Sequence, residues 1–145
     1  RNTLSGINYV VETLKIDELL ILDGKGYHLD TFFTPVLNSQ NLLCATIVCD
    51  EILTNKSKRD LYEFSKKRNL PIFKVPLKDS IGTLENIGSF SVNALPLPGV
   101  LISPNHFTNK SIDRDLLELG IKRVVTPTSQ FELSGGSIHC LTNEL

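Results

Sequence analysis

The sequence contains no methionine, no tryptophan and only three cysteines among its 145 residues. Three cysteines are too few, and odd in number, for a framework of disulfide bonds. No CxxC or HxxxH spacing occurs, and zinc sites usually need ligands paired in this way. We therefore expect no bound metal, no cofactor, and cysteines that stay reduced, as they do in the cytoplasm.

Long apolar runs and an excess of one charge are also missing. The apolar runs fall far short of the roughly 20 residues that a membrane span needs. The 15 basic and 16 acidic residues are interspersed and give a net charge of −1, so no basic face is available for nucleic acid. The first residues do not combine a charged region with an apolar one, so we expect no secretory signal. Membrane and nucleic acid are therefore excluded as expected partners.

What remains is the composition of an ordinary globular domain. Hydrophobic residues make up 41% and charged residues 21% of the chain, and its length fits one domain over residues 1–145. The chain starts at Arg1 rather than at a methionine. We therefore expect it to be a processed chain or one part of a longer protein.

The order of the expected elements recurs along the chain. Apolar spacing predicts a helix over residues 7–16, capped by Ser5. Further helices are expected at 56–69 and 109–119, and strands at 19–24, 28–37, 41–49, 71–77, 89–99, 99–104, 121–127 and 137–144. Strand, strand, helix, strand thus appears from 28 to 77 and again from 89 to 127. This recurrence predicts an α/β protein of stacked, repeated units rather than one sheet.

The segment SGGSIHCLT places two glycines just before a lone cysteine, Cys140. Gly135 and Gly136 allow positive φ angles and the close approach of another group. On the expected strand, Cys140 and His139 would point to opposite faces. Cys140 is a nucleophile if a base or a positive charge lowers its pKa, and otherwise a buried structural residue. The other cysteines, Cys44 and Cys49, lie in the apolar run LLCATIVC and are interpreted as core residues.

A second cluster of reactive side chains lies in GKGYHLDTFFT. His28 and Asp30 are two positions apart, so on a strand they share one face. A histidine and a carboxylate placed in this way can move protons and bind a cation; the alternative is a solvated surface pair. His106 and His139 have no comparable neighbours, and we expect His106 to be solvated.

Together the two clusters resemble a known family. HLDT followed by FFT resembles the histidine strand of arginine deiminases, and GGSIHCLT resembles the nucleophile strand of the same superfamily, the guanidino-group-modifying enzymes or penteins. The stretch SFSVNALPLPGVLISPNHFTNKSIDRDLLELGIKRVV is similar to the module that precedes the nucleophile in that family. The resemblance extends from about residue 15 to the C-terminus.

The resemblance implies a fold, an activity and site residues. The implied fold is an αβ propeller of repeated ββαβ modules. Its catalytic residues would be Cys140 as nucleophile, His28 as general acid and base, and Asp30 as the carboxylate that binds the guanidinium. The substrate-binding residues would be Asp30, Asn93, Gly135 and Gly136, with the glycines letting the flat guanidinium lie close to the chain. The implied reaction is hydrolysis of arginine or a derivative through a covalent thiouronium. The alternatives are an amidinotransferase and a non-catalytic binding module.

The sequence also departs from the family. A complete propeller needs roughly twice this length, so the chain would supply about half of the modules. No segment before His28 resembles the family's acidic residues that bind the guanidinium and orient the histidine. We therefore expect this chain to be the C-terminal part of the enzyme. Its partner would be the N-terminal half of the same enzyme, or a second chain that completes the propeller.

Overall fold

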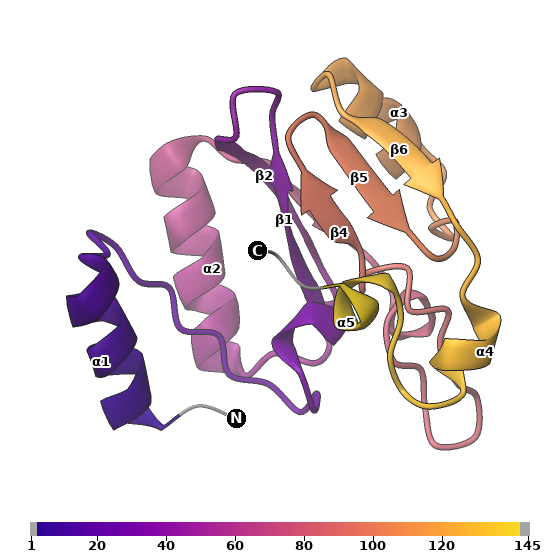
Figure 1. Cartoon of the computed structure of the whole chain (residues 1–145), viewed down its shortest axis with the longest axis horizontal. Coiled ribbons are helices and arrows are strands. Elements are labelled where there is room, and N and C mark those ends of the chain that lie inside the picture. Colours follow the sequence, from indigo (N-terminus) through magenta and orange to yellow (C-terminus); the bar gives the residue numbers. More distant parts are fainter. Residues whose placement is uncertain (1–2, 143–145) are drawn as a thin grey trace.

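The computed structural model of the chain describes residues 3–142 (Figure 1). The helices are α1 (Leu4–Leu14), α2 (Asn55–Arg68), α3 (Ser111–Glu118), α4 (Ser129–Glu132) and α5 (Ile138–Leu141). The strands are β1 (Phe33–Leu37), β2 (Leu43–Val48), β3 (Ile72–Lys74), β4 (Leu95–Leu97), β5 (Val100–Ser103) and β6 (Lys122–Val125), and 3₁₀ turns form at Leu29–Thr31 and Leu77–Asp79. Within the described range, no helix is both long and apolar enough to cross a membrane.

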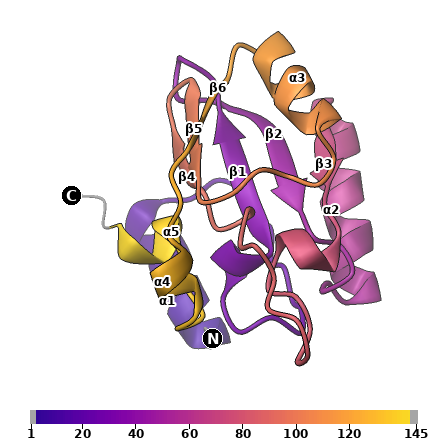
Figure 2. The same cartoon turned by 90° about the vertical axis from the view of Figure 1, so that its right-hand side faces the viewer.

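The six strands form two small sheets with the same topology. One sheet has the order β1-β2-β3 and the other β4-β5-β6. In each, the first two strands are antiparallel and the third pairs parallel with the second after a helix. The helices α2 and α3 lie on the same side of the sheets (Figure 2). The predicted repeat of strand, strand, helix, strand is therefore confirmed. We call residues 28–74, with the segment that leads into β1, the first module, and residues 90–125, with the segment that leads into β4, the second.

Three helices end in the same way. Lys15, Asn69 and Gly120 each adopt a positive φ angle, at 50°, 54° and 77°. The next residue in each case donates its N–H to the carbonyl five positions back: Ile16 to Val11, Leu70 to Ser65, and Ile121 to Leu116. This is the Schellman arrangement, which satisfies carbonyls at a helix end.

The segments that follow these three helices differ in whether they pair into a sheet. After α2 and α3 the chain enters β3 and β6, which complete the two sheets. After α1 it runs through residues 19–22, where Leu20 and Leu22 contact the core. That segment pairs with no strand among the described residues, beyond the single bridge between Gly24 and Leu53. Residues 3–22 thus form a helix and an extended segment that contacts the core.

A shared core joins the two modules along β1 and β4. The Thr34 hydroxyl donates to the carbonyl of Val92, and the Gly99 N–H donates to Leu37 at 3.0 Å. Each module's helix contributes a buried stripe, with Leu61 from α2 and Ile112 and Leu116 from α3. The largest fully buried hydrophobic side chains are Phe107, Ile47, Leu61, Leu101, Ile112, Leu116, Ile121, Val36, Val48 and Val92.

Several expected elements differ from the observed ones. The prediction of a strand at 137–144 is wrong for the residues that the structure describes, because Ile138–Leu141 is a helical turn. Residues 143–144 lie outside the described range. Residues 28–32 do not begin β1: the Thr31 N–H and hydroxyl both turn back to the His28 carbonyl. Residues 19–24 and 89–94 form no strand. Thr3 rather than Ser5 caps α1, with its hydroxyl accepting from the Gly6 N–H at 3.2 Å.

Candidate active site

The three residues predicted to be catalytic come together in the structure. His28 and Asp30 lie just before β1, and Cys140 lies in α5 after the second module. One donor or acceptor atom from each residue lies within 4.8 Å of the other two. The predicted convergence is confirmed, although the two segments are far apart in the sequence. At this separation a proton can pass between His28 and a molecule bound at the sulfur.

Asp30 is the centre of this cluster. Its Oδ2 accepts a hydrogen bond from the Cys140 thiol at 3.2 Å and lies 3.0 Å from the His139 Nδ1. Its Oδ1 accepts no hydrogen bond from any residue in the range 3–142. Asp30 is half-buried, whereas His28 and Cys140 are exposed. The carboxylate therefore keeps one oxygen available for an incoming cation.

The environment of Cys140 keeps its sulfur protonated. Burial raises the pKa of this thiol, and the Asp30 carboxylate raises it further. The backbone at Ser137 and the Asn93 amide oppose this by hydrogen bonding to the sulfur. The resting residue is thus a thiol that donates to Asp30, and a positive charge beside the sulfur would favour the thiolate.

The other two cysteines have the structural character expected of them. Cys49 is fully buried, and burial raises its pKa to about 11. Cys44 is half-buried against the core. Only Cys140 among the three is exposed. Its surroundings therefore differ in kind from those of the other thiols.

Asn93 holds Cys140 in place. Its side chain is fully buried just before β4. The amide nitrogen lies 3.2 Å from the Asp30 carbonyl and 3.3 Å from the Cys140 sulfur, and the amide oxygen accepts from the Cys140 N–H at 3.4 Å. Its backbone carbonyl also accepts from the His139 N–H at 3.3 Å. The observed contacts make Asn93 part of the framework, and contact with substrate stays a prediction.

The two glycines allow the chain to fold back tightly on itself. Gly135 has φ +84°, and a Cβ there would lie 3.3 Å from the Tyr27 hydroxyl. A Cβ on Gly136 would lie 3.2 Å from the Cys140 Cβ and 3.4 Å from its sulfur. The close approach that the sequence predicted is thus an approach to side chains of this chain itself. A role of these glycines in binding a guanidinium stays a prediction.

A polar network fixes the segment that leads to the glycines. The Glu132 Oε1 accepts from the Asn105 amide and from the Thr128 hydroxyl, each at 3.1 Å. The hydroxyls of Thr128 and Ser137 are hydrogen-bonded at 2.6 Å, and Ser137 is fully buried. Asn105 of the second module therefore holds the middle of this segment, and Thr128 joins its start to Ser137.

Two residues of the site were missed from the sequence. His139 was expected to point away from Cys140, and this is wrong. Successive residues of a helical turn are about 100° apart rather than 180°, so both side chains reach Asp30. Tyr27 was not considered, yet its hydroxyl donates to the Gly135 carbonyl and its ring meets the edge of His28 with centroids 5.3 Å apart. His106 is exposed, as expected.

The same cluster has the donor types of a metal site. The atoms offered by His28, Asp30 and Cys140 are of the kinds that bind zinc, and their separations permit it. The thiol, however, already donates to the carboxylate, and metal binding would require its deprotonation. That the protein uses no metal stays a prediction.

Comparison with known proteins shows a likeness of fold. No family model and no curated protein sequence matches the chain. Apo ArgZ, an arginine dihydrolase from the ornithine–ammonia cycle in cyanobacteria, is similar with a TM-score of 0.75 and 23% identity over 97% of this chain and 19% of that chain. The N-terminal domain of ArgZ bound to product gives 0.72 and 24%, over 97% of this chain and 46% of that chain. The chain therefore spans less than half of that domain.

Other solved forms and a second kind of enzyme share this fold. SxtG, an amidinotransferase from Microseira wollei, gives a TM-score of 0.62 and 17% identity over 96% of this chain and 38% of that chain. The same ArgZ domain is known as a cysteine-to-serine variant bound to substrate, and another variant is covalently bound to a reaction intermediate. The resemblance to guanidino-group-modifying enzymes is thus confirmed as a likeness of fold, in an α/β architecture with small mixed sheets.

Proposed function

We propose that this chain carries the catalytic cysteine, histidine and carboxylate of an enzyme that hydrolyses the guanidino group of arginine or a derivative. One observation carries the proposal: the Asp30 carboxylate contacts the Cys140 sulfur at 3.2 Å while its second oxygen stays open, and His28 lies within reach of both. A cation-binding group, a nucleophile and a proton carrier therefore occupy one place. The fold that the chain shares with an arginine dihydrolase supports the same assignment.

Substrate binding would activate the sulfur. A guanidinium is a planar cation whose N–H groups pair with both oxygens of a carboxylate. When the guanidinium binds the Asp30 carboxylate, it displaces the hydrogen bond from the Cys140 thiol and places a positive charge beside the sulfur. The charge that raises the pKa of Cys140 in the empty site is then neutralised, and the thiolate is favoured. The thiolate is therefore favoured more strongly when a substrate is bound than when it is not.

The first half of the reaction forms a covalent intermediate. As the substrate binds, the Cys140 thiol gives its proton to His28, the thiolate attacks the central guanidinium carbon, and a carbon–sulfur bond forms. His28 in its protonated form donates its proton to the departing nitrogen as the carbon–nitrogen bond breaks. The products of this half are ammonia and an S-alkylthiouronium attached to Cys140.

The second half releases the product. Neutral His28 takes a proton from water, whose oxygen attacks the thiouronium carbon. The carbon–sulfur bond then breaks, the thiolate returns, and a ureido compound such as citrulline leaves. Asp30 orients the reacting carbon throughout and does not itself transfer a proton. The covalent intermediate known for a variant of the ArgZ domain supports this scheme.

An amidinotransferase is the second candidate function, because SxtG shares the fold. The same thiouronium would then react with an amine in place of water, and His28 would deprotonate that amine. Hydrolysis is preferred because the arginine dihydrolase structures give the higher TM-scores and identities.

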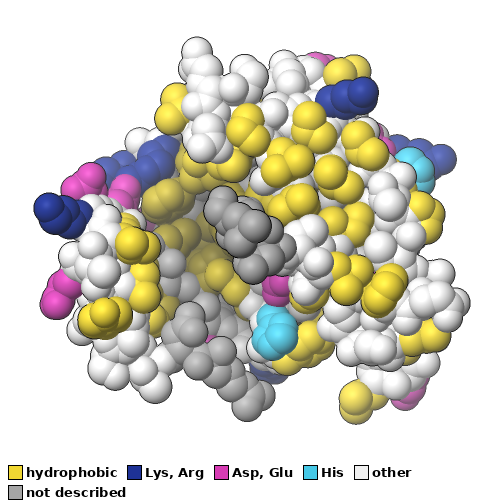
Figure 3. Space-filling model, in the orientation of Figure 1, with side chains coloured by type: hydrophobic (Ala, Val, Ile, Leu, Met, Phe, Trp, Pro, Cys, Tyr) yellow, Lys and Arg dark blue, Asp and Glu magenta, His cyan; other side chains and the backbone are white. Residues whose placement is uncertain are grey.

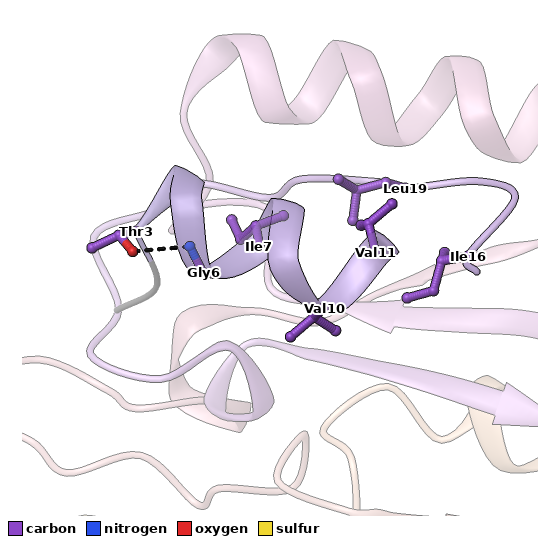
Figure 4. Close-up of a pocket in the computed structure, with 7 residues that line it drawn as sticks. All are labelled: Thr3, Gly6, Ile7, Val10, Val11, Ile16 and Leu19. Atoms are coloured by element: carbon purple, nitrogen blue, oxygen red, sulfur yellow. Dashed lines mark hydrogen bonds between the residues drawn. The ribbon is translucent and has the colours of Figure 1, made fainter. Parts of the chain in front are cut away.

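We also propose that a complementary segment completes the fold. No residue of α1 is buried, and Leu19 and Ile21 in the unpaired segment after it are about half exposed. A groove of about 540 Å³ runs between α1 and this segment, and Ile7, Val11 and Leu19 line it (Figure 4). Figure 3 shows hydrophobic side chains gathered on this face, in a hollow beside α1 and over β4–β6.

Surfaces of this kind are normally covered. In each of the two complete modules a β-hairpin pairs with the strand that follows the helix, and we infer that a hairpin of the same kind would pair with residues 19–22. The missing N-terminal half of the enzyme, or a second chain that supplies it, would bring that hairpin. It would also bring the acidic group that orients His28, whose ring forms no hydrogen bond within residues 3–142. We place the assembled enzyme in the cytoplasm, where its three free thiols stay reduced.

Two alkylating reagents of the same shape test the site in the chain as it stands. Chloroacetamidine is a planar cation and chloroacetamide is its neutral counterpart. We expect Cys140 to react about 10²-fold faster with the cation, the scale of one well-placed electrostatic contact, and Cys44 and Cys49 to show no preference. Peptide mapping measures each rate. Equal rates at Cys140 would contradict the proposed function.

Turnover separates an enzyme from a binding module. The chain is supplied with the complementary half, and release of citrulline, ornithine and ammonia from arginine is measured with and without Cys140→Ala. We expect ammonia release that the substitution abolishes. Preference for the cationic reagent without turnover in the complete protein would favour the binding module, and transfer to an added amine would favour the amidinotransferase.

A further inference from the structure

Two segments make the site, and only a few hydrogen bonds join them directly. Three such bonds connect residues 27–32 with residues 135–142 in the described chain. Two of them, from Cys140 and His139, end on the Oδ2 of Asp30. The third is donated by the Tyr27 hydroxyl to the Gly135 carbonyl. Only this third bond does not use the carboxylate.

A cation bound at Asp30 would weaken two of these three hydrogen bonds. When a guanidinium takes the Asp30 carboxylate, the bonds from Cys140 and His139 compete with it for the same oxygens. Asn93 still holds Cys140, but it anchors the sulfur to the second module rather than to the His28 segment, apart from its bond to the Asp30 carbonyl. The Tyr27–Gly135 bond is then the direct side-chain link that survives.

The placement of Tyr27 suits such a link. It directly precedes His28, and its ring meets that imidazole edge-on, with centroids 5.3 Å apart and planes at 64°. Its partner Gly135 is the positive-φ residue of the turn before Cys140. One side chain therefore contacts the proton carrier with its ring and the nucleophile segment with its hydroxyl. We propose that Tyr27 is a positioning residue that keeps the Cys140 sulfur within reach of His28 while a cation occupies Asp30. This inference rests on the proposed function.

The ionisation of Tyr27 fits the role. Burial raises the pKa of its phenol, and the charges of Cys140 and Asp30 raise it further. The hydroxyl therefore remains a hydrogen-bond donor when the thiolate forms beside it. A phenolate could only accept, and it would repel the sulfur.

The test compares Tyr27→Phe with the wild-type chain, using the cationic and neutral reagents. The substitution keeps the ring against His28 and removes the one hydrogen bond. We expect alkylation of Cys140 by chloroacetamidine, which occupies Asp30, to slow by about tenfold, because small displacements of reacting groups cost rate steeply. Alkylation by chloroacetamide, which leaves the Asp30 bonds in place, should stay within about twofold. The exposed Tyr9→Phe on α1 is the matched control and should change neither rate.

The outcomes separate the two proposals. If Tyr27→Phe slows both reagents equally, or neither, Tyr27 has only a structural role and the inference is wrong. If the wild-type chain shows no preference for the cation, the proposed function fails and this inference fails with it. The unfolding midpoint of each variant is measured alongside, so that a general loss of structure is recognised.

Discussion

The segments that lead into the first strand of each module differ between the two modules, although the topology is the same. Before β1, a 3₁₀ turn at Leu29–Thr31 leaves His28 exposed and Asp30 half-buried. Before β4, residues 90–94 are buried, and Phe90 adopts a positive φ of 51°. From this second segment only the Asn93 amide reaches the site, and it is enclosed by contacts with Asp30 and Cys140.

The difference separates the side chains proposed to react with a substrate from the side chain that supports them. In the proposed function, the first module presents the groups that meet the substrate and exchange protons, and these groups lie where solvent can reach them. The second module presents a neutral amide whose hydrogen bonds are all made within the chain, and burial strengthens such bonds. A repeated fold can thus place different side chains at equivalent positions around one site. Substitutions in the two segments should therefore have different consequences.

The largest expected effect is the loss of the preference of Cys140 for a cationic reagent, caused by Asp30→Asn in the first module. The amide has nearly the same shape but no charge, so the preference of Cys140 for chloroacetamidine over chloroacetamide should fall by about 10²-fold. The unfolding midpoint should change little, because the residue is only half-buried. The ratio of the two alkylation rates is the measurement. The exposed Asp17→Asn is the control, and a ratio that survives Asp30→Asn would show that the carboxylate does not bind the cation.

The next largest expected effect is a loss of stability, caused by Asn93→Ala in the second module. Removal of this amide leaves the Cys140 N–H and the Asp30 carbonyl without their partner in a buried setting. The free energy of unfolding should fall by about 2–3 kcal/mol. Urea denaturation measures it, with the exposed Asn86→Ala as a control that should stay within about 0.5 kcal/mol. A loss no greater than that of the control would contradict the supporting role of Asn93.

The smallest expected effect is a shift in the pH dependence of the rate at which Cys140 is alkylated. The thiolate is the reactive form, so alkylation by the neutral chloroacetamide should rise with pH. Its inflection should lie above that of the unfolded chain, because burial and Asp30 raise the pKa of Cys140. Asp30→Asn removes one of these causes and should move the inflection down, whereas Asn93→Ala should not. An inflection in the folded chain at or below that of the unfolded chain would contradict this account.

Much of the fold could be predicted from local patterns. The helices α2 and α3 follow from periodicity and were predicted, and the glycines that follow β4 and α3, Gly99 and Gly120, both adopt positive φ angles as turn residues do. The ends of strands were not, since a strand extends only as far as its partner. Residues 19–24 have the composition of a strand, yet in the described chain a single bridge is their only strand-like pairing.

The site was predicted in its members but not in its geometry. His28, Asp30 and Cys140 follow from residue type and from the resemblance of two short motifs. Their hydrogen bonds depend on the path of the backbone, and SIHCLT reads as a strand because its apolar and polar residues alternate. The structure forms a helical turn there, and Asn93, distant in the sequence, accepts hydrogen bonds from the backbone of His139 and Cys140. No local pattern carries that long-range information.

The hydrogen bond from the Cys140 thiol to Asp30 should also slow the reaction of the sulfur with oxidants. Peroxide attacks a thiolate, and an exposed cysteine of low pKa in an open site is oxidised easily. Here the Cys140 sulfur donates at 3.2 Å to the Asp30 carboxylate, and burial together with this carboxylate raises the pKa of the thiol. The sulfur becomes vulnerable only when a cation arrives, and at that moment the cation itself lies against it. If the proposed function holds, the contact that favours the thiol until a substrate binds would also preserve the nucleophile between turnovers.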